Sequence, residues 1–271
     1  MWQDGITSHA PLDGTTVQHE RAYHSDANDA PGHQTKDVNA RFCNGIRSGM
    51  ELTPQNMSRG ERYKLLTGII LPRPIAFVST VSADGHVNLA PYSFFTGAGA
   101  DPMALVFCPT TRDDGSDKDT LRNLLPPDKG GTGTFVVNAA VVRHAREINA
   151  AAANLPPDAS EFELCGLTPT PSVVVAPPRV LEAPVAFECR TLQVVRLAPG
   201  VPTSGVVVIG EVVHITIDDA LVDANYRVNG EALDPLARLA GGQFARVGER
   251  FSLPRGASAM QAPLPPKPRE D

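Results

Sequence analysis

The segment GSDKDTLRNLL, residues 115–125, brings hydroxyl, ammonium and carboxylate side chains to the start of a predicted short helix. Free N–H groups and the positive end of the helix dipole gather at such a position. With the Lys118 ammonium and the hydroxyls of Ser116 and Thr120, the arrangement suits a phosphate group. In the alternative interpretation, Asp119 or Thr120 only caps the helix and Lys118 is a solvated surface charge. The local sequence leaves both interpretations open.

A second stretch, NLAPYSFFTGAGADP at residues 88–102, carries no charge before Asp101. Small side chains such as Ala90 and Ser93 favour the close approach of a flat, polar ligand to the backbone. The alternative is a plain connection between strands. The GAGA motif within it lacks the third glycine of a dinucleotide-binding loop and no helix follows it, which argues against a Rossmann site.

The remaining chemistry-bearing residues form no known site pattern. The four cysteines lie far apart and make no Cys-x-x-Cys, so we expect reduced thiols at Cys43, Cys108, Cys165 and Cys189 rather than a metal or disulfide site. The seven histidines form no H-E-x-x-H motif. The aspartates within residues 113–119 lack the spacing of an EF-hand.

Composition excludes further classes of function. The net charge of −6 argues against nucleic acid as a partner, because phosphate neutralisation needs clustered Lys and Arg. No apolar run approaches the roughly 20 residues that cross a bilayer, and the first residues lack the apolar core of a signal peptide. We therefore expect a cytoplasmic protein that binds neither nucleic acid nor membrane.

Strands dominate the elements that must position these residues. Segments rich in β-branched and aromatic residues predict six strands, at residues 75–82, 86–95, 103–108, 133–138, 179–197 and 205–218. Helices are predicted at residues 58–66, 120–125, 141–155 and 233–240; Ser58 and Glu61 have capping-box spacing, and Gly68 is expected to end the first helix. Turns as short as residues 83–85 cannot carry parallel crossovers, so we expect a mainly β, antiparallel fold that closes into a barrel.

The two ends of the chain have a different composition from its middle. Residues 1–50 are rich in Asp, His, Asn, Gly and Thr and have almost no periodic apolar residues, which predicts a disordered extension. The Pro-rich tail, residues 254–271, is also predicted to be disordered. One compact domain is expected at residues 51–253.

Within that domain, an ordered set of motifs resembles the flavin reductase-like family of FMN-binding split barrels. The motifs are LPRPIAFVSTVSADGHVNLAPYSFFTGAGADP, RDDGSDKDTLRNL, FVVN, FELCGLTPTPS, PVAFECR, GEVVHI and DPLARLAGGQFARVGE. They cover about residues 52–250. The set is specific to the family, though not to a substrate. One departure is Phe244, where the family often has Tyr.

The resemblance implies a six-stranded antiparallel split barrel with a few short helices, which forms a homodimer and binds FMN, with FAD as the alternative. The segment matching Asn88–Phe95 is expected to line the flavin ring and ribityl chain, and the segment matching Ser116–Thr120 to hold the phosphate. The implied flavin-binding residues are Ser79, Thr80, Asn88, Ala90, Tyr92, Ser93, Phe94, Ser116, Lys118, Asp119, Thr120 and Asn138. Ser79 and Thr80 have the alternative of merely continuing their strand, and at least one of the aromatics is expected to be plain core.

The resemblance also implies a function. It predicts an FMN-binding oxidoreductase whose flavin takes hydride from NADH or NADPH, with a flavin-dependent oxygenase as a further partner. Because the cofactor carries the chemistry, no catalytic acid, base or nucleophile is expected from the protein. One alternative is an FMN-binding electron carrier or storage module without efficient nicotinamide turnover. Another is a dimeric scaffold that has lost flavin.

Overall fold

The structure, a computed structural model, describes residues 49–156 and 159–264. The chain divides into two units, residues 1–52 and residues 53–271, and every helix and strand of the described residues belongs to the second unit. The expectations for residues 1–48, Cys43 among them, lie outside the described residues. In the predicted tail, the described part contains the 3-10 helix η5 (Gly256–Gln261), which has no buried residue.

The first α-helix, α1 (Arg59–Ile69), begins as its sequence predicts. The Ser58 hydroxyl accepts from the Glu61 N–H at 3.3 Å, and the Glu61 carboxylate accepts from the Ser58 N–H at 2.9 Å. This capping box satisfies two of the N–H groups that a helix start leaves free. The predicted end was wrong: Gly68 lies inside the helix and Ile70 is the C-cap. The short 3-10 helix η1 (Pro54–Asn56) precedes α1.

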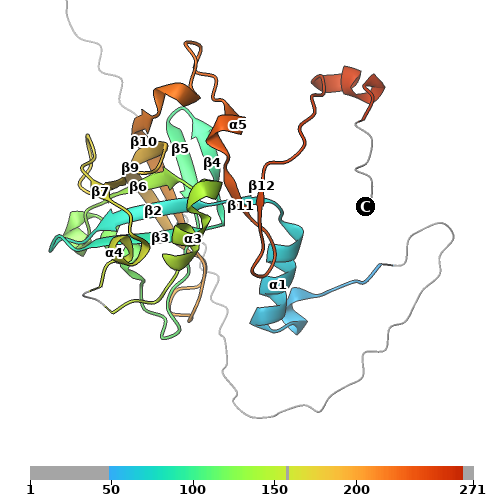
Figure 1. The fold of residues 1–271 in the computed structure, drawn as a ribbon. Helices are drawn as coiled ribbons and strands as arrows, with labels where there is room; N and C mark the ends of the chain where they lie inside the picture. The colour runs from blue at the N-terminus through green and yellow to red at the C-terminus, as the bar shows by residue number, and fades with distance from the viewer. Residues whose placement is uncertain (1–48, 157–158, 265–271) are drawn as a thin grey trace, which may run out of the picture. The chain divides into compact units, whose positions relative to one another are not determined.

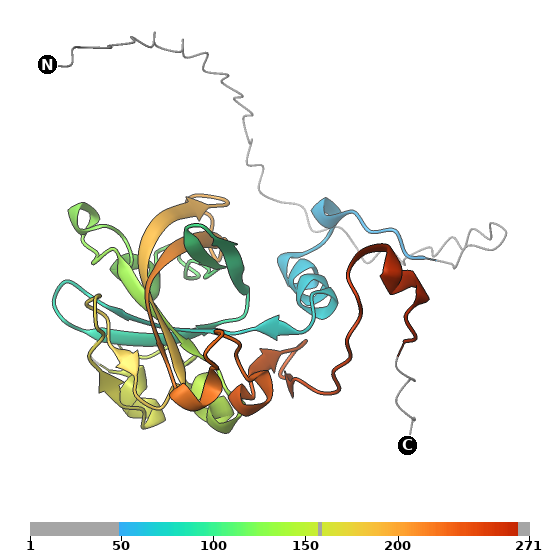
Figure 2. The ribbon, with the colours of Figure 1, turned by 90° about the horizontal axis from the view of Figure 1, so that it is seen from above.

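Seven antiparallel strands form the main sheet, in the spatial order β3-β2-β6-β9-β10-β5-β4 (Figure 1). Their bounds are β2 (Ala76–Val81), β3 (Val87–Tyr92), β4 (Phe95–Ala100), β5 (Met103–Phe107), β6 (Thr134–Ala139), β9 (Val185–Arg196) and β10 (Val206–Ile217). Strands β3 and β4 are the two edges, yet only Ser93 and Phe94 separate them in the chain. The three steps from Tyr92 to Phe95 span at most ~10 Å, so the sheet must curl until its edges approach (Figure 2).

The mainly β, antiparallel barrel predicted from the sequence is confirmed, with seven strands in the main sheet instead of six. The extra strand arises because the predicted strand at 86–95 splits at Ser93 and Phe94, and its last residue opens β4. The turn at residues 83–85 is present, with Gly85 at φ +87° and its N–H bonded to the Ser82 carbonyl. Pro91, which lacks an N–H, lies on an edge strand, where a missing donor costs least.

One predicted helix was wrong near the end of the domain. The helix expected at residues 233–240 is replaced by α5 (Gly230–Leu233) and the strand β11 (Leu236–Arg238). Pro235 explains the change, because the residue before a proline is disfavoured in a helix, and Asp234 has φ +45°. Strand β11 lies between β1 (Arg73–Pro74) and β12 (Phe244–Arg246) in a separate three-stranded sheet.

The other predicted segments are present in shorter pieces. The strand expected at 179–197 forms β8 (Arg179–Val180), which pairs with β7 (Pro169–Thr170), and then β9. The helix expected at 141–155 is the 3-10 turn η3 (Val142–His144) followed by α3 (Ala145–Ala150). The remaining elements are α2 (Asp119–Asn123), η2 (Pro127–Lys129), α4 (Glu161–Cys165) and η4 (Asp219–Leu221).

Two apolar clusters pack on the two faces of the curled sheet. One gathers Val78, Leu121, Leu124, Phe107 and Phe135, and the other gathers Ile75, Phe77, Leu89, Ile148 and Phe162. Gly210 in β10 makes room for the first cluster, because a Cβ there would lie 2.3 Å from the Phe135 ring. Helix α2 closes the first cluster, and α3 and α4 cover the second.

The described residues contain no helix that is both long and apolar enough to span a membrane.

Candidate functional site

A wide hollow of about 640 Å³ lies along the edge strand β3. The β2–β3 hairpin and β3 itself form one wall, the start of α2 forms another, and residues 151–156 together with Ala159 and Glu161 complete it. Six of the residues that the resemblance points to line this hollow: Asn88, Ala90, Tyr92, Lys118, Asp119 and Thr120. The structure therefore brings the two stretches singled out in the sequence, residues 88–92 and 118–120, to one place.

A buried polar cluster forms the floor of the wide hollow. The Thr120 hydroxyl oxygen accepts from the Asn88 amide and from the Tyr92 hydroxyl, each at 2.9 Å. The Thr80 hydroxyl oxygen accepts from Asn123 at 3.0 Å and from Asn88 at 3.3 Å. With two lone pairs used as acceptors, Thr120 keeps its O–H to donate. Thr120 is buried and lines the hollow, so its O–H is a candidate donor to a ligand there.

Two acids beside the hollow have raised pKa values. Burial raises the pKa of Tyr92 to about 12, against a smaller opposing effect of its hydrogen bond to Thr120. Tyr92 therefore remains a neutral hydroxyl at neutral pH. Burial also raises the pKa of Glu161, although its carboxylate accepts from the Leu89 N–H at 3.1 Å. That contact fixes the start of α4 against β3.

Cationic side chains gather at the α2 end of the hollow. Arg112, Lys118 and Arg122 all line it, together with Asp119. The Asp119 carboxylate bridges the two guanidinium groups, at 2.8 Å from Arg112 and in direct contact with Arg122. The Lys118 ammonium has neither a hydrogen bond nor an ion pair within residues 49–156 and 159–264. At this end of the hollow three cations stand beside one carboxylate, while Asp84 of the hairpin and Glu161 of α4 also line the hollow. The α2 end therefore suits an anion.

Three of the residues implied by the resemblance lie beneath this surface. Thr80 belongs to the floor of the hollow, while Ser79, its neighbour on β2, faces the opposite side of the sheet and contacts Asn138 of β6. Asn138 donates to the Phe77 carbonyl and to Ser79, and accepts from the Val180 N–H at 2.9 Å. The Ser79 hydroxyl donates to the Pro178 carbonyl at 2.5 Å. All three are fully buried, and neither Ser79 nor Asn138 lines the wide hollow.

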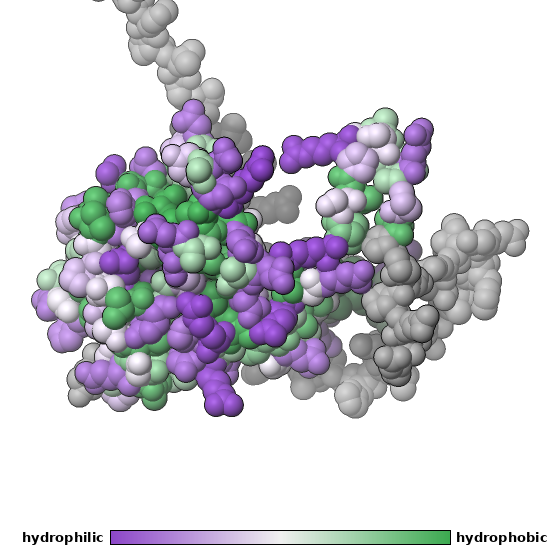
Figure 3. Space-filling model, turned by 45° about the horizontal axis from the view of Figure 1, so that its top comes forward, coloured by the Kyte–Doolittle hydropathy of each residue, from purple (hydrophilic) through white to green (hydrophobic). Residues whose placement is uncertain are grey.

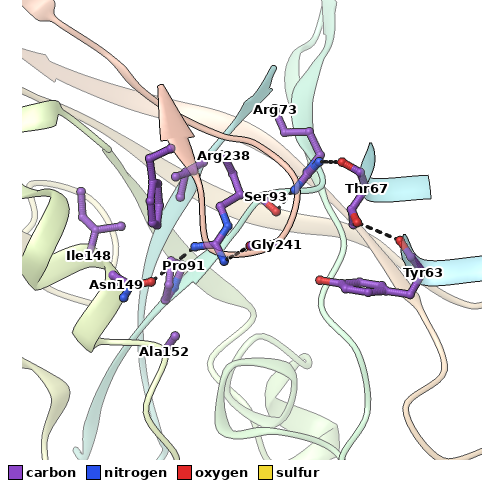
Figure 4. Close-up of a pocket in the computed structure, with 12 residues that line it drawn as sticks. Tyr63, Thr67, Arg73, Pro91, Ser93, Ile148, Asn149, Ala152, Arg238 and Gly241 are labelled. Carbon is purple, nitrogen blue, oxygen red and sulfur yellow. Dashed lines mark hydrogen bonds between the residues drawn. The ribbon is translucent and has the colours of Figure 1, made fainter. Parts of the chain in front are cut away.

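The last three implied residues lie at other places. Ser93 lines a neighbouring cavity, where it accepts from the Arg73 guanidinium at 3.4 Å (Figure 4). The Phe94 ring lies 5.8 Å from the same guanidinium. Ser116 is exposed, and its N–H donates to Asp114 rather than facing the hollow. Of the predicted phosphate segment, the structure thus places residues 118–120 at the hollow and leaves Ser116 outside.

Sequence reasoning missed Arg112, Arg122 and Glu161. The two arginines stand within the motif RDDGSDKDTLRNL, and Arg122 follows Asp119 by three residues, a spacing that places both on one helix face. That spacing could have predicted the ion pair between Arg122 and Asp119. Glu161 lies 72 positions from its partner Leu89, and no local pattern links them.

The family model for the flavin reductase like domain matches residues 68–232 of the chain. The match covers more than half of the sequence, and the chain belongs to the flavin reductase-like family. An uncharacterized protein of Halalkalibacterium halodurans is 39% identical over 208 residues, which are 76% of this chain and 96% of the relative.

Solved structures give the same fold. Nitrilotriacetate monooxygenase component B from Bacillus cereus is 37% identical, with a TM-score of 0.71 over 77% of this chain and 100% of the other. The 2-nitrobenzoate 2-nitroreductase NbaA of Pseudomonas fluorescens is 29% identical, with a TM-score of 0.67 over 80% and 100%. A putative flavin reductase with a split barrel domain from Shewanella frigidimarina, 20% identical with a TM-score of 0.62 over 77% and 100%, supports the split-barrel fold.

Proposed function

We propose that the protein is an oxidoreductase that holds FMN in the wide hollow and reduces it with NADH or NADPH. The observation that carries the proposal is the unpaired Lys118 ammonium beside Arg112, Arg122 and the Thr120 hydroxyl, at one end of a hollow whose other wall is the neutral strand β3. The hollow's volume of about 640 Å³ falls within the ~300–1,000 Å³ of ordinary ligand sites.

The phosphate of FMN fits the α2 end of the hollow. Lys118 supplies an ammonium without a competing acceptor in the described part of the chain, and Thr120 supplies a hydroxyl donor. Asp119 would repel a phosphate by itself, but its carboxylate contacts both Arg112 and Arg122. Its role is therefore to position the two guanidinium groups.

The flat ring system fits along β3. Ala90 lies between Asn88 and Tyr92 on one face of the strand, and its methyl group leaves the backbone accessible. Tyr92 offers a hydroxyl that stays protonated at neutral pH, because burial raises its pKa to about 12. The side chains of this wall bind and orient without adding charge.

When bound, FMN supplies the redox chemistry, accepting hydride from a nicotinamide cofactor. The protein's own residues hold the ligand and shield it from water. Glu161, whose pKa burial raises, is the acid on β3's side of the hollow whose geometry is fixed by a backbone contact to Leu89. No residue of the chain needs to act as an acid, base or nucleophile in this proposal.

We also propose that the protein works as a homodimer. Helix α1 and the residues after it expose large apolar side chains, among them Tyr63 at 59% and Ile69 at 76%, while Thr67 is the only buried residue of the helix. An apolar helix face of this size ordinarily has a protein partner. Apolar residues also reach the surface among polar ones in Figure 3. A second copy of the chain is the partner that the proposal names.

An oxygenase is the electron acceptor that the proposal favours. The similar Bacillus cereus structure is named as component B of a monooxygenase. By analogy, reduced flavin from this protein would serve a separate flavin-dependent oxygenase.

The test has two parts, done on the purified full-length chain. The first is the visible absorption spectrum of the protein and its titration with FMN, which we expect to give a tight, stoichiometric complex. The second is consumption of NADH and NADPH with added FMN, where we expect turnover with at least one of them. Binding without turnover would favour an electron carrier or storage module, and no binding at all would contradict the proposal.

A further inference from the structure

A second cavity of about 280 Å³ lies beside the wide hollow and shares Pro91 and Ala152 with it (Figure 4). Residues from α1, β1, β3, α3, β11 and β12 line it. Its walls combine apolar side chains with two guanidinium groups, those of Arg73 and Arg238, and no lining residue is acidic. The cavity thus carries two positive charges with no carboxylate to balance them.

The two arginines are direct cross-strand neighbours. In the antiparallel pair of β1 with β11, Arg73 lies opposite Arg238. Like charges in that position are destabilising unless something compensates for them. Within the described residues neither arginine takes part in an ion pair. Burial lowers the pKa of Arg73, and the charge of Arg238 contributes to that lowering. The repulsion between the two arginines lowers the free energy of unfolding. A bound anion would offset that loss.

The two guanidinium groups differ in how many of their N–H donors already have an acceptor in the protein. Arg73 is buried and donates to the carbonyls of Thr67 and Leu239, to that of Ile70, and to Ser93. It therefore ties α1, β1 and the β11–β12 turn together and supplies a fixed charge.

Arg238 uses only some of its N–H donors within the protein. It donates to the Gly241 carbonyl at 2.7 Å and, at a long 3.4 Å, to the Asn149 amide oxygen. Its guanidinium lies 4.4 Å from the centre of the Phe244 ring, which holds its plane. A guanidinium has five N–H donors, so more than half of those of Arg238 remain for a ligand.

We propose that this cavity binds a small planar organic acid, whose carboxylate pairs with the Arg238 guanidinium. The guanidinium fork matches a carboxylate with two parallel hydrogen bonds. The apolar walls, which include Ile75, Ile148 and Phe244, suit a flat hydrocarbon ring. The volume lies just below the range of ordinary ligand sites, so a one-ring molecule fits and a dinucleotide does not. The inference needs only the cavity and is independent of the flavin proposed for the wide hollow.

The ligand test is calorimetric titration of the full-length protein, with and without saturating FMN, using benzoate as the probe. Benzamide has the same ring and no charge, so it is the matched control. We expect benzoate to bind at least ~10-fold more tightly than benzamide, the loss expected for one charge-assisted hydrogen bond. Equal binding of the two, no binding of benzoate, or equally tight binding of inorganic phosphate would each contradict the proposal.

The variant test replaces Arg238→Gln and compares it with Arg246→Gln. Arg246 is exposed on the neighbouring strand β12, pairs with Asp234, and does not line the cavity. We expect Arg238→Gln to weaken benzoate about 10- to 150-fold and Arg246→Gln to leave it unchanged. Thermal melting identifies a variant that fails to fold, and in that case the benzoate–benzamide comparison in the unaltered protein decides.

FMN binding is measured separately in the same samples. Loss of benzoate with FMN affinity retained supports a distinct acid site. If FMN displaces benzoate competitively, the cavity belongs to the flavin site and the inference is wrong. Absence of FMN binding would remove the proposed function and leave the benzoate result intact.

Discussion

Ser79 and Thr80 are neighbours on β2 and are both fully buried, yet they belong to two different polar clusters. Successive side chains of a strand point to opposite faces of the sheet. Ser79 joins Asn138 and the backbone of residues 178–180, where every group has a partner within the protein. Thr80 joins Asn88, Asn123 and Thr120 under the wide hollow.

The difference is one of remaining hydrogen-bonding capacity rather than burial. The Ser79–Asn138 cluster is closed, since both the amide N–H groups and the amide oxygen of Asn138 are used. The cluster around Thr120 keeps one unused O–H donor, on a residue that lines the hollow. Substitutions in the first should therefore change stability alone, and substitutions in the second should change both stability and flavin affinity.

The largest expected effect is on the closed cluster. Asn138→Ala leaves the Val180 N–H without its acceptor and the Phe77 carbonyl without the amide donor, at about 1–3 kcal/mol for each group left unsatisfied. The Ser79 hydroxyl loses the amide donor but keeps its bond to the Pro178 carbonyl. We expect a loss of about 3 kcal/mol or more in the free energy of unfolding, which lowers the melting temperature by about 6–12 °C. Asn225→Ala, at an exposed position, is the control. A folded Asn138→Ala protein with unchanged melting would mean that the cluster is not structural.

A smaller loss of stability is expected at Thr120, together with a loss of FMN affinity. Thr120→Val keeps the shape and removes the hydroxyl, so Asn88 and Tyr92 lose their shared acceptor and the hollow loses a donor. We expect about 1–3 kcal/mol less stability, and FMN affinity reduced about tenfold. Ser79→Ala, on the opposite face, is the matched control and should lower stability while FMN affinity stays the same. Equal FMN affinities in the two variants would contradict the claim that only the Thr120 cluster takes part in flavin binding.

Tyr92 gives a still smaller effect that depends on pH. Tyr92→Phe removes one hydrogen bond, worth about 1 kcal/mol at neutral pH. Between the ordinary tyrosine pKa of about 10 and the raised pKa of about 12, the unfolded chain releases the Tyr92 proton while the folded chain keeps it bound. Ionisation of Tyr92 stabilises the unfolded state, so the contribution of Tyr92 to the free energy of unfolding decreases as pH rises above about 10.

Urea unfolding at pH 7 and again between pH 10 and 11 measures this. The advantage of the unaltered protein over Tyr92→Phe should shrink with rising pH. Tyr226→Phe, at a residue that is 90% exposed, is the control for replacing a tyrosine by phenylalanine. A constant difference across this range would argue that the Tyr92 hydroxyl is not enclosed.

The sequence predicted the fold class, and six of the twelve residues implied by the resemblance line the wide hollow. Strand segments such as 133–138 are apolar and β-branched, and the Ser58 capping box is local, so both can be recognised without tertiary contacts. Tertiary context decided the rest. No local pattern distinguishes Ser79 from Thr80. Each has a hydrogen-bond partner far along the chain, Pro178 for Ser79 and Asn123 for Thr80. Arg238 was hidden in a predicted helix, and only the pairing of β11 with β1 brings it to Arg73.

The central claim is that the wide hollow holds FMN with its phosphate at Lys118. The most direct measurement titrates FMN and riboflavin into the unaltered protein, Lys118→Met and Lys129→Met. Riboflavin has the ring and ribityl chain without the phosphate, and Lys129 is an exposed lysine that does not line the hollow.

Removing the Lys118 ammonium deletes a charge-assisted hydrogen bond worth about 1.5–3 kcal/mol. The account predicts that Lys118→Met weakens FMN about 10- to 150-fold, barely changes riboflavin, and that Lys129→Met changes neither. Equal losses for FMN and riboflavin, or no loss for either, would contradict the placement of the phosphate at Lys118.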